Sequence, residues 1–321
     1  MARKLSLVFL IVFALGGCIH IDLMPGMGAL QEITISGEGS EKILLIDISG
    51  TLTTSKDSGL FSAPSLPARL KEELTKAEKD EHIKAIVLRI NTPGGTVTAS
   101  DILYHELQQF KQKRGVPIIA SIMDIGTSGG YYVAMASDYI FAHPSTITGS
   151  IGVIMLTINA QGLLETVGIH PTAIVSGPKK SMGSPFRAMK DEERAIFQDI
   201  IDRLYGRFLA VVEEGRPQLD PTRIRELADG RIYTADIAQA AGLIDEIGYL
   251  DDAIEWAKKS AKLTEAQVVT YTRNSRDAHQ NIYSHFEPPV IGQLGFPQIN
   301  ANTFIGALHG GTPQMLYMWI P

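Results

Sequence analysis

Short apolar runs alternate along this chain with segments of helical periodicity, and this alternation restricts the fold more than any other feature. The apolar runs cover residues 42–48, 85–90, 116–123 and 153–158, each about the length of one buried strand. Strands that are separated by helices pair in parallel through right-handed crossovers. The sequence therefore predicts an α/β fold around a parallel sheet. The apolar positions with helical spacing are Leu66, Leu70, Leu74 and Ala77, then Ala99, Leu103, Leu107 and Phe110, and later Ile196, Ile200, Leu204, Phe208 and Val212.

The composition excludes several classes of protein. Of 321 residues, 45% are hydrophobic and 20% are charged, which is typical of a globular rather than a disordered chain. The net charge of −6 argues against a nucleic-acid partner, because phosphate binding needs a clustered excess of Lys and Arg. The single cysteine, Cys18, permits no internal disulfide and no cysteine-rich metal site. We expect neither a metal nor a cofactor.

The N-terminus has the layout of an export signal. Arg3 and Lys4 precede residues 5–17, a 13-residue uncharged run, whereas a membrane-spanning helix needs about 20 apolar residues. The run ends in Leu-Gly-Gly before Cys18, which resembles the lipobox of bacterial lipoproteins. The resemblance implies removal of residues 1–17 as a lipoprotein signal peptide and attachment of lipid to Cys18. The alternative is an ordinary secretory signal followed by an inert cysteine.

Lipid would then be the only membrane anchor. Loss of the signal leaves 27 basic and 35 acidic residues, a net charge of −8, so attraction to anionic lipid headgroups is not expected. Two or three acyl chains on Cys18 would hold the protein stably on a membrane. We therefore expect the protein in the cell envelope, lipid-anchored to a bacterial membrane on its extracytoplasmic side.

Three regions follow the signal. Residues 18–41 are rich in glycine and are predicted to form a lipid-anchored tether. Residues 42–285 hold the predicted strands and helices and would form the main domain. Residues 286–321 contain one charged residue, Glu287, and are predicted to be an apolar tail. Because an exposed apolar tail is a liability, we expect it to dock on its own protomer or on a neighbouring one.

Two glycine-rich turns follow predicted strands, and both are candidate parts of a catalytic site. Residues 126–130 (Gly-Thr-Ser-Gly-Gly) open a helix, which exposes Ser128 and leaves nearby amides free to bind an anion. Residues 91–95 (Asn-Thr-Pro-Gly-Gly) end the preceding strand. Ligands collect at the carboxyl ends of parallel strands, so the N–H groups of Gly95 and Gly129 could face one tetrahedral oxyanion. Each turn by itself is more typical of a structural role.

A nucleophilic serine also needs a base, and the histidines offer no clear candidate. A lysine can serve instead where its surroundings disfavour the charged form. Lys179 and Lys180 lie in an otherwise uncharged stretch, residues 175–185. The pattern alone does not choose between them. The histidines beside prolines or in polar segments are His143, His170, His279 and His285.

Four segments, in order, resemble the serine-type bacterial signal peptide peptidase A family. They are RINTPGG (residues 89–95), GTSGGYYVAMASDYIFAHPSTITGSIGV (126–153), SGPKKSMGSPFR (176–187) and DGRIYTADIAQAAGLIDEIG (229–248). The resemblance extends over roughly residues 42–257, and its motifs are specific. Many members of that family carry a membrane-spanning helix where this chain has the lipobox.

The resemblance implies a fold of the crotonase and caseinolytic-protease type, with stacked ββα units assembled into a homo-oligomeric ring or dome. Ser128, in the SGGYY block, would be the nucleophile, and Lys180 the general base. Gly95 and Gly129 would supply the oxyanion hole, and Ser150 would hydrogen-bond the lysine amine. The active sites would be shared between adjacent protomers.

The predicted function is that of a lipid-anchored serine endopeptidase with a Ser–Lys dyad. By resemblance, its substrates would be released signal peptides and other unfolded apolar peptides at the membrane. An esterase of the α/β-hydrolase type is a second hypothesis, because Ser128, Asp245 and either His279 or His285 occur in the right order. A non-catalytic lipoprotein scaffold is a third. The segments around Lys180 and Gly95 argue against the esterase, and the presence of both nucleophile and base argues against the scaffold.

Overall fold

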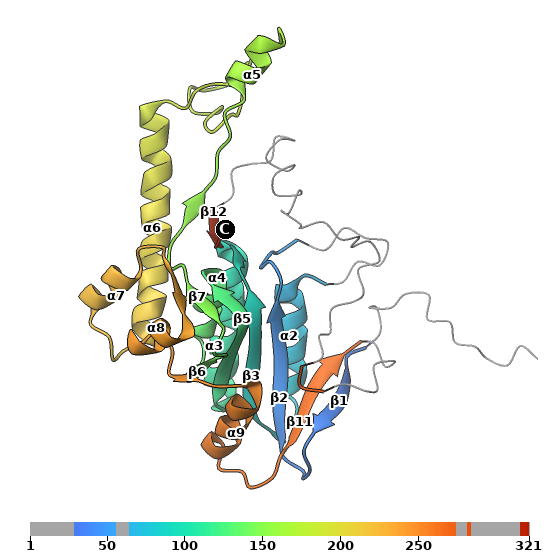
Figure 1. The fold of residues 1–321 in the computed structure, drawn as a ribbon. Helices are drawn as coiled ribbons and strands as arrows, with labels where there is room; N and C mark the ends of the chain where they lie inside the picture. Colours follow the sequence, from blue (N-terminus) through green and yellow to red (C-terminus); the bar gives the residue numbers. More distant parts are fainter. Residues whose placement is uncertain (1–28, 56–63, 274–280, 284–314, 321) are drawn as a thin grey trace, which may run out of the picture.

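A mainly parallel sheet forms the body of the molecule (Figure 1). The computed structural model describes residues 29–55, 64–273, 281–283 and 315–320. The strand order is β1-β11-β2-β3-β5-β6-β10, and every pair along it is parallel except β1 with β11. This arrangement confirms the predicted α/β class. The strands are β1 (Gln31–Ser36), β2 (Lys42–Ser49), β3 (Ile83–Thr92), β5 (Ile118–Thr127), β6 (Tyr139–Ala142), β10 (Glu246–Ile247) and β11 (Gln267–Thr272).

Helices cover both faces of this sheet, as the side chains of β2 show. Leu44 and Ile46 belong to one hydrophobic cluster, shared with α2, α3 and α4, whereas Ile43 and Leu45 belong to a second, shared with α9. A strand that is buried on both faces has a continuous apolar sequence. Residues 42–48 could be predicted for that reason. The helices are α2 (Leu66–Ala77), α3 (Val97–Arg114), α4 (Gly129–Ala134), α7 (Pro221–Leu227), α8 (Ala235–Ala240) and α9 (Leu250–Ser260).

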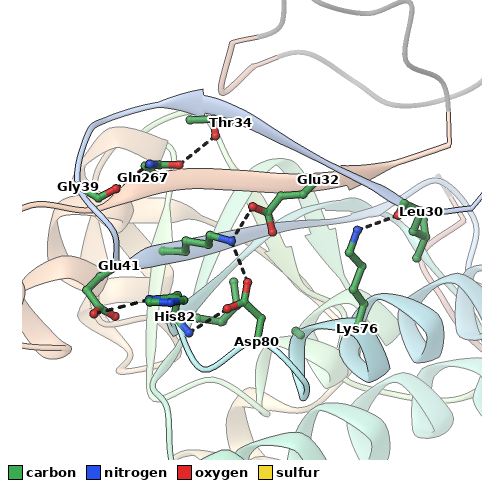
Figure 2. A network of polar contacts seen from close by, with 12 residues as sticks. Leu30, Glu32, Thr34, Gly39, Glu41, Lys76, Asp80, His82 and Gln267 are labelled. Carbon is green, nitrogen blue, oxygen red and sulfur yellow. Dashed lines mark hydrogen bonds and ion pairs between the residues drawn. The ribbon is translucent and has the colours of Figure 1, made fainter.

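The last part of the predicted tether, residues 18–41, is instead an edge of the sheet. Within it, β1 pairs antiparallel with β11. Polar contacts fix this edge to the body (Figure 2): Lys42 Nζ lies 2.7 Å from a Glu32 carboxylate oxygen, and Lys76 Nζ donates to the Leu30 carbonyl at 2.7 Å. The tether prediction is therefore wrong for the segment from residue 31 onward. The strand was missed because only two of its six residues are even partly buried and its partner lies more than 200 residues later.

A second, three-stranded sheet has the order β4-β12-β8. Its middle strand comes from the C-terminal tail, so the described part of the tail docks on its own chain, with Tyr317 fully buried. The predicted buried strand over residues 153–158 is wrong in extent and burial, because only two residues pair and both are half-buried. The strands are β4 (Gly94–Thr96), β8 (Ile154–Met155) and β12 (Met315–Met318).

Residues 156–190, here called the arm, project from the body beside the N-terminal half of α6 (Asp191–Gly215), with α5 (Gln161–Thr166) near the tip (Figure 1). No residue of the arm is buried. Helix α6 belongs to both regions. Near its N-terminus, Arg187 of the arm pairs with the buried Glu193 at 2.6 Å, whereas Phe208 and Val212 pack fully buried in the body.

Candidate active site

Ser128 lies at the sharp connection between β5 and α4. Its φ of 52° and ψ of −113° are unusual for a residue with a Cβ atom, a conformation that costs about 1–3 kcal/mol. Two backbone hydrogen bonds hold it: Ser128 N–H donates to the Gly149 carbonyl at 2.7 Å, and Tyr132 N–H donates to the Ser128 carbonyl at 2.9 Å. Strain that the surroundings enforce in this way is common at active sites. The turn therefore presents the Ser128 side chain at the carboxyl end of the sheet.

Ser150 stands beside Ser128 and also has a positive φ. The strand β7 (Ile147–Gly149) pairs in parallel with β5, and Thr127 lies opposite Gly149. The next residue of each strand is a serine at positive φ, 52° for Ser128 and 51° for Ser150. On the other side, Ser150 N–H donates to the Arg231 carbonyl at 2.7 Å, next to β9 (Ile232–Thr234). The structure thus brings together two of the residues singled out from the sequence.

The two glycine turns also meet. A Cβ atom added to Gly94 would come within 2.8 Å of the Gly129 nitrogen, and one added to Gly129 within 3.3 Å of the Gly94 Cα. Gly95 is equally confined, because an added Cβ would lie 1.9 Å from the Leu52 carbonyl oxygen. Glycine is required at such close backbone approaches. Gly95 and Gly129, the predicted oxyanion donors, thus lie in abutting turns beside Ser128.

Lys180 is not brought to Ser128 within the chain. It lies in the arm, where its N–H donates to the Gly177 carbonyl at 3.0 Å and its side chain is exposed. Across the described ranges, Lys180 forms no ion pair, whereas its neighbour Lys179 pairs with Glu192. A Ser128–Lys180 contact is thus absent from this part of the chain, and the lysine is the one predicted catalytic residue set apart from the others.

The residues of the esterase hypothesis are not assembled around Ser128. Asp245 accepts from the Ile140 N–H at 2.7 Å and lies 3.3 Å from Arg216. Ile140 is opposite Ala120 in β5, eight residues before Ser128, which is about 25 Å away along an extended strand. Asp245 is therefore committed to structural contacts at the far end of β5. His279 and His285 lie outside the described residues, as do Cys18 and the predicted signal peptide, residues 1–17.

An aromatic cluster next to Ser128, formed by Tyr104, Tyr132, Phe208 and Tyr317, was not anticipated from the sequence. Tyr132, one helical turn after Ser128, contacts Tyr104 and Phe208 with ring centroids 5.4 and 5.1 Å apart. Tyr317 stacks on Tyr132 at 5.2 Å. Burial raises the pKa of Tyr132 and of Tyr317, which keeps both hydroxyls protonated. The sequence feature that could have placed an aromatic ring beside Ser128 is the spacing of Ser128 and Tyr132, because residues four apart share one face of a helix.

Within the described ranges, no group of three or more His, Cys, Asp or Glu residues could hold a metal ion. In the same ranges, no helix combines the length and apolar character needed to cross a membrane.

Comparison with known proteins identifies the family. The profile of peptidase family S49 matches residues 110–264, which include Ser128, Ser150 and Lys180. The chain is 36% identical over 252 residues to a protein named as a signal peptide peptidase SppA in Enterococcus faecium, covering 78% of this chain and 73% of that one. It is 33% identical over 277 residues to a protein named as a protease in Methanocaldococcus jannaschii, covering 84% and 86%.

Among solved structures, the ClpP1 of Listeria monocytogenes superimposes with a TM-score of 0.43 at 17% identity, covering 65% of this chain and 94% of that one. This structural likeness is only a general one, so the family is identified from the sequence relatives. Both relatives exceed 30% identity over more than two thirds of their own length. The chain belongs to peptidase family S49, the family of the SppA signal peptide peptidases, and is a serine peptidase.

Proposed function

We propose that this peptidase is an endopeptidase in which the Ser128 hydroxyl attacks the peptide carbonyl. The observation that carries the proposal is the pair of serines, Ser128 and Ser150, held at positive φ on the ends of two paired strands. The abutting glycine turns support it, because two amides beside the nucleophile suit a tetrahedral oxyanion. Gly95 and Gly129 would donate to that oxyanion.

Lys180 is the proposed general base, supplied by a neighbouring copy of the chain. In its own chain Lys180 is exposed on the arm, and the arm carries apolar side chains that no described residue covers. A neighbouring body would cover that surface and disfavour the ammonium form of a lysine placed between the two copies. Ser150 would accept or donate a hydrogen bond that orients the lysine amine. This arrangement gives a homo-oligomer, a ring or dome, with each active site shared between two protomers.

The proposed substrates are released signal peptides and other unfolded apolar peptides. The name of the Enterococcus relative supports this class, as does the shared site, which folded proteins could not enter. Lipid on Cys18 is the proposed anchor, on the extracytoplasmic face of a bacterial membrane. Because β1 begins at Gln31, the proposed tether shortens to residues 18–30.

Complementation between two inactive variants tests the shared site. Ser128→Ala and Lys180→Ala should each reduce peptide cleavage by about 10⁴-fold, because nucleophile and base act as a unit. Chains carrying the two substitutions, co-expressed and assembled at random, should recover activity at about a quarter of the interfaces. Lys179→Ala is the matched control, and it should remain active because Lys179 already pairs with Glu192.

Three results would contradict parts of the proposal. A mixed assembly that contains both chains and stays inactive would mean that serine and lysine come from one chain. Near-normal turnover of Lys180→Ala, with an inactive histidine variant, would favour the esterase hypothesis. The mass of the mature N-terminus tests the lipid anchor. A mature chain that begins at a residue other than Cys18 and carries no lipid would exclude lipidation.

A further inference from the structure

A side-chain hydrogen bond joins the two helices that follow the glycine turns. Helix α3 begins at Val97, two residues after Gly95, and α4 begins at Gly129 itself. The Tyr132 hydroxyl, in the first turn of α4, donates to Asp101 Oδ1 of α3 at 2.7 Å. This contact therefore connects the two segments that carry the proposed oxyanion donors, and it lies within two helical turns of each donor.

Tyr132 is fixed to the turn that carries the nucleophile. Its ring is fully buried and packs against Tyr104 and Phe208. Its N–H donates to the Ser128 carbonyl at 2.9 Å, which helps to hold the strained backbone at that residue. Because a ring in a close-packed interior has no free space in which to move, a displacement of Tyr132 is passed to the backbone of Ser128 and Gly129.

Asp101 is fixed in a similar way to the turn at Gly95. The Thr96 side chain caps α3, and Ser100 Oγ donates to the Thr96 carbonyl at 3.0 Å. A Cβ atom added to Gly129 would lie 2.3 Å from the same Ser100 oxygen. The start of α3 therefore contacts both turns, so a shift of α3 relative to α4 changes the distance between the amides of Gly95 and Gly129.

Arg207 of α6 holds the Asp101 carboxylate in place. Its Nε donates at 2.9 Å to Asp101 Oδ1, the oxygen that also accepts from Tyr132. The ion pair is partly exposed, with 56% of the Arg207 side chain and 31% of the Asp101 side chain accessible, so it contributes little to stability. Its contribution is instead to aim one carboxylate oxygen at the Tyr132 hydroxyl.

We propose that Asp101 is a positioning residue for the oxyanion hole: through Tyr132 it sets the distance between the amides of Gly95 and Gly129. The inference rests on the proposed function and deepens it by naming a residue that acts on the reaction without touching the substrate. When Ser128 attacks, negative charge develops on the carbonyl oxygen, and the two amides stabilise it only if both lie about 2.7–3.1 Å from that oxygen. Loss of the hydrogen bond between Asp101 and Tyr132 lets one amide move away, which slows the chemical step and leaves peptide binding unchanged.

The first test separates kcat from KM. Tyr132→Phe keeps the buried ring and removes the hydroxyl, and Asp101→Ala removes its acceptor. In both variants kcat on unfolded casein should fall about tenfold with KM unchanged, because one donor is displaced rather than removed; outright removal would cost about 10²–10³-fold. Tyr139→Phe is the matched control, since it also removes a tyrosine–carboxylate hydrogen bond, to Glu246 at 3.1 Å, and should keep the parent kcat.

Asp101→Asn tests whether the acceptor oxygen is what matters. The amide keeps an oxygen for the Tyr132 hydroxyl and for Arg207, so kcat should stay within about threefold of the parent value. If Asp101→Asn is as slow as Asp101→Ala, or if kcat is unchanged in Tyr132→Phe, the inference is overturned.

The second test probes the oxyanion hole with a pair of inhibitors. The peptide aldehyde acetyl-Leu-Leu-leucinal reacts with the nucleophile: the Ser128 oxygen bonds to the aldehyde carbon, its proton passes to the base, and the former carbonyl oxygen becomes an oxyanion. The matching alcohol, acetyl-Leu-Leu-leucinol, binds without forming one. Tyr132→Phe should weaken inhibition by the aldehyde about tenfold and leave inhibition by the alcohol unchanged.

The ratio of the two inhibition constants distinguishes positioning from a merely structural role. Both constants are measured on folded molecules, so their ratio does not depend on how much of the variant folds. If inhibition by aldehyde and alcohol weakens equally, or if only the thermal midpoint falls, Asp101 stabilises the fold and the inference is wrong.

The two levels of proposal fail differently. If the parent enzyme cleaves casein in a Ser128-dependent manner but Tyr132→Phe keeps the parent's kcat and inhibitor ratio, only the present inference is wrong. If the parent cleaves no peptide or unfolded protein above the Ser128→Ala background, the proposed function itself is wrong.

Discussion

The body and the arm differ in what covers their apolar side chains. In the body, strands β2, β3 and β5 are buried on both faces by helices of the same chain. In the arm, Leu163 is 68% exposed and Ile174 is 99% exposed. Of the thirteen exposed large hydrophobic residues among the described ranges, seven belong to the 35 residues of the arm. Apolar surface at this density is typical of interaction sites, so the arm is the region that the proposed assembly would cover.

The largest expected effect on the free energy of unfolding is in the body, where the charge of Arg89 is buried. Arg89 is 1% exposed and makes a bidentate contact with Asp47, with Nη2 and Oδ2 2.7 Å apart. Arg89→Met would leave the Asp47 carboxylate buried without its partner. The free energy of unfolding should fall by about 4 kcal/mol. Urea denaturation measures it.

The matched control for Arg89→Met is Arg223→Met, at an exposed ion pair with Glu226. That substitution should leave the denaturation midpoint nearly unchanged, because exposed ion pairs contribute little. Equal midpoints for the two variants would contradict the view that the body depends on internal charge pairing.

The second expected effect is a change in the stability of the body with pH. Burial raises the pKa of Glu73 to about 7, although Arg69 lies 3.8 Å away. The unfolded chain loses this proton near its ordinary pKa of about 4.5, whereas the folded chain keeps it until about pH 7. Over that interval the folded state binds more protons, so its stability falls as pH rises, by about 3 kcal/mol in total.

Glu73→Gln should remove this part of the pH dependence between pH 5 and pH 8. Glu255→Gln is the control, since the Glu255 side chain is 68% exposed. The measurement is the free energy of unfolding by urea at several pH values. An identical slope in Glu73→Gln and the parent protein would show that Glu73 does not carry the effect.

The smallest expected effect on stability is in the arm. Ile174→Ser should change the free energy of unfolding by less than about 0.5 kcal/mol, because the side chain has almost no contacts to lose. It should nevertheless weaken the proposed assembly, which sedimentation velocity can measure as a shift toward smaller species. Ile237→Ser, at an isoleucine 53% exposed on the body, is the matched control and should not shift it. If the Ile174→Ser variant assembles like the parent protein, the contact between copies of the chain does not include this part of the arm.

The sequence predicted those elements whose signal is local. The helices α2, α3 and α6 follow from apolar residues at helical spacing, and β2 and β3 from continuous apolar runs. The turns at Gly95 and Ser128 could be found because each follows such a run. Parallel strands then place both turns at one edge of the sheet.

The elements that were missed depend on distant partners. β1 and β12 have ordinary short sequences, Gln-Glu-Ile-Thr-Ile-Ser and Met-Leu-Tyr-Met, and each becomes a strand only because a remote segment offers an open edge. The aromatic cluster joins Tyr132 to Phe208 and Tyr317, which lie 76 and 185 positions later in the chain. Likewise, the exposure of Lys180 could not be read from its uncharged flanks, because it follows from the projection of the whole arm away from the body (Figure 1).

Helix α6 belongs to both the arm and the body, so it can transmit a movement from one region to the other. Its 25 residues make a rod about 37 Å long, with Glu193 paired to the arm and Phe208 in the aromatic cluster. A helix that is held at one end by a neighbouring copy and packed at the other end into the body transmits a tilt from the first end to the second. If copies of the chain contact one another through their arms, a small tilt of each helix would move Phe208 against Tyr132, which lies one helical turn after Ser128. Assembly would then change the backbone geometry at Ser128, and chains kept apart would cleave peptides at a different rate from assembled ones.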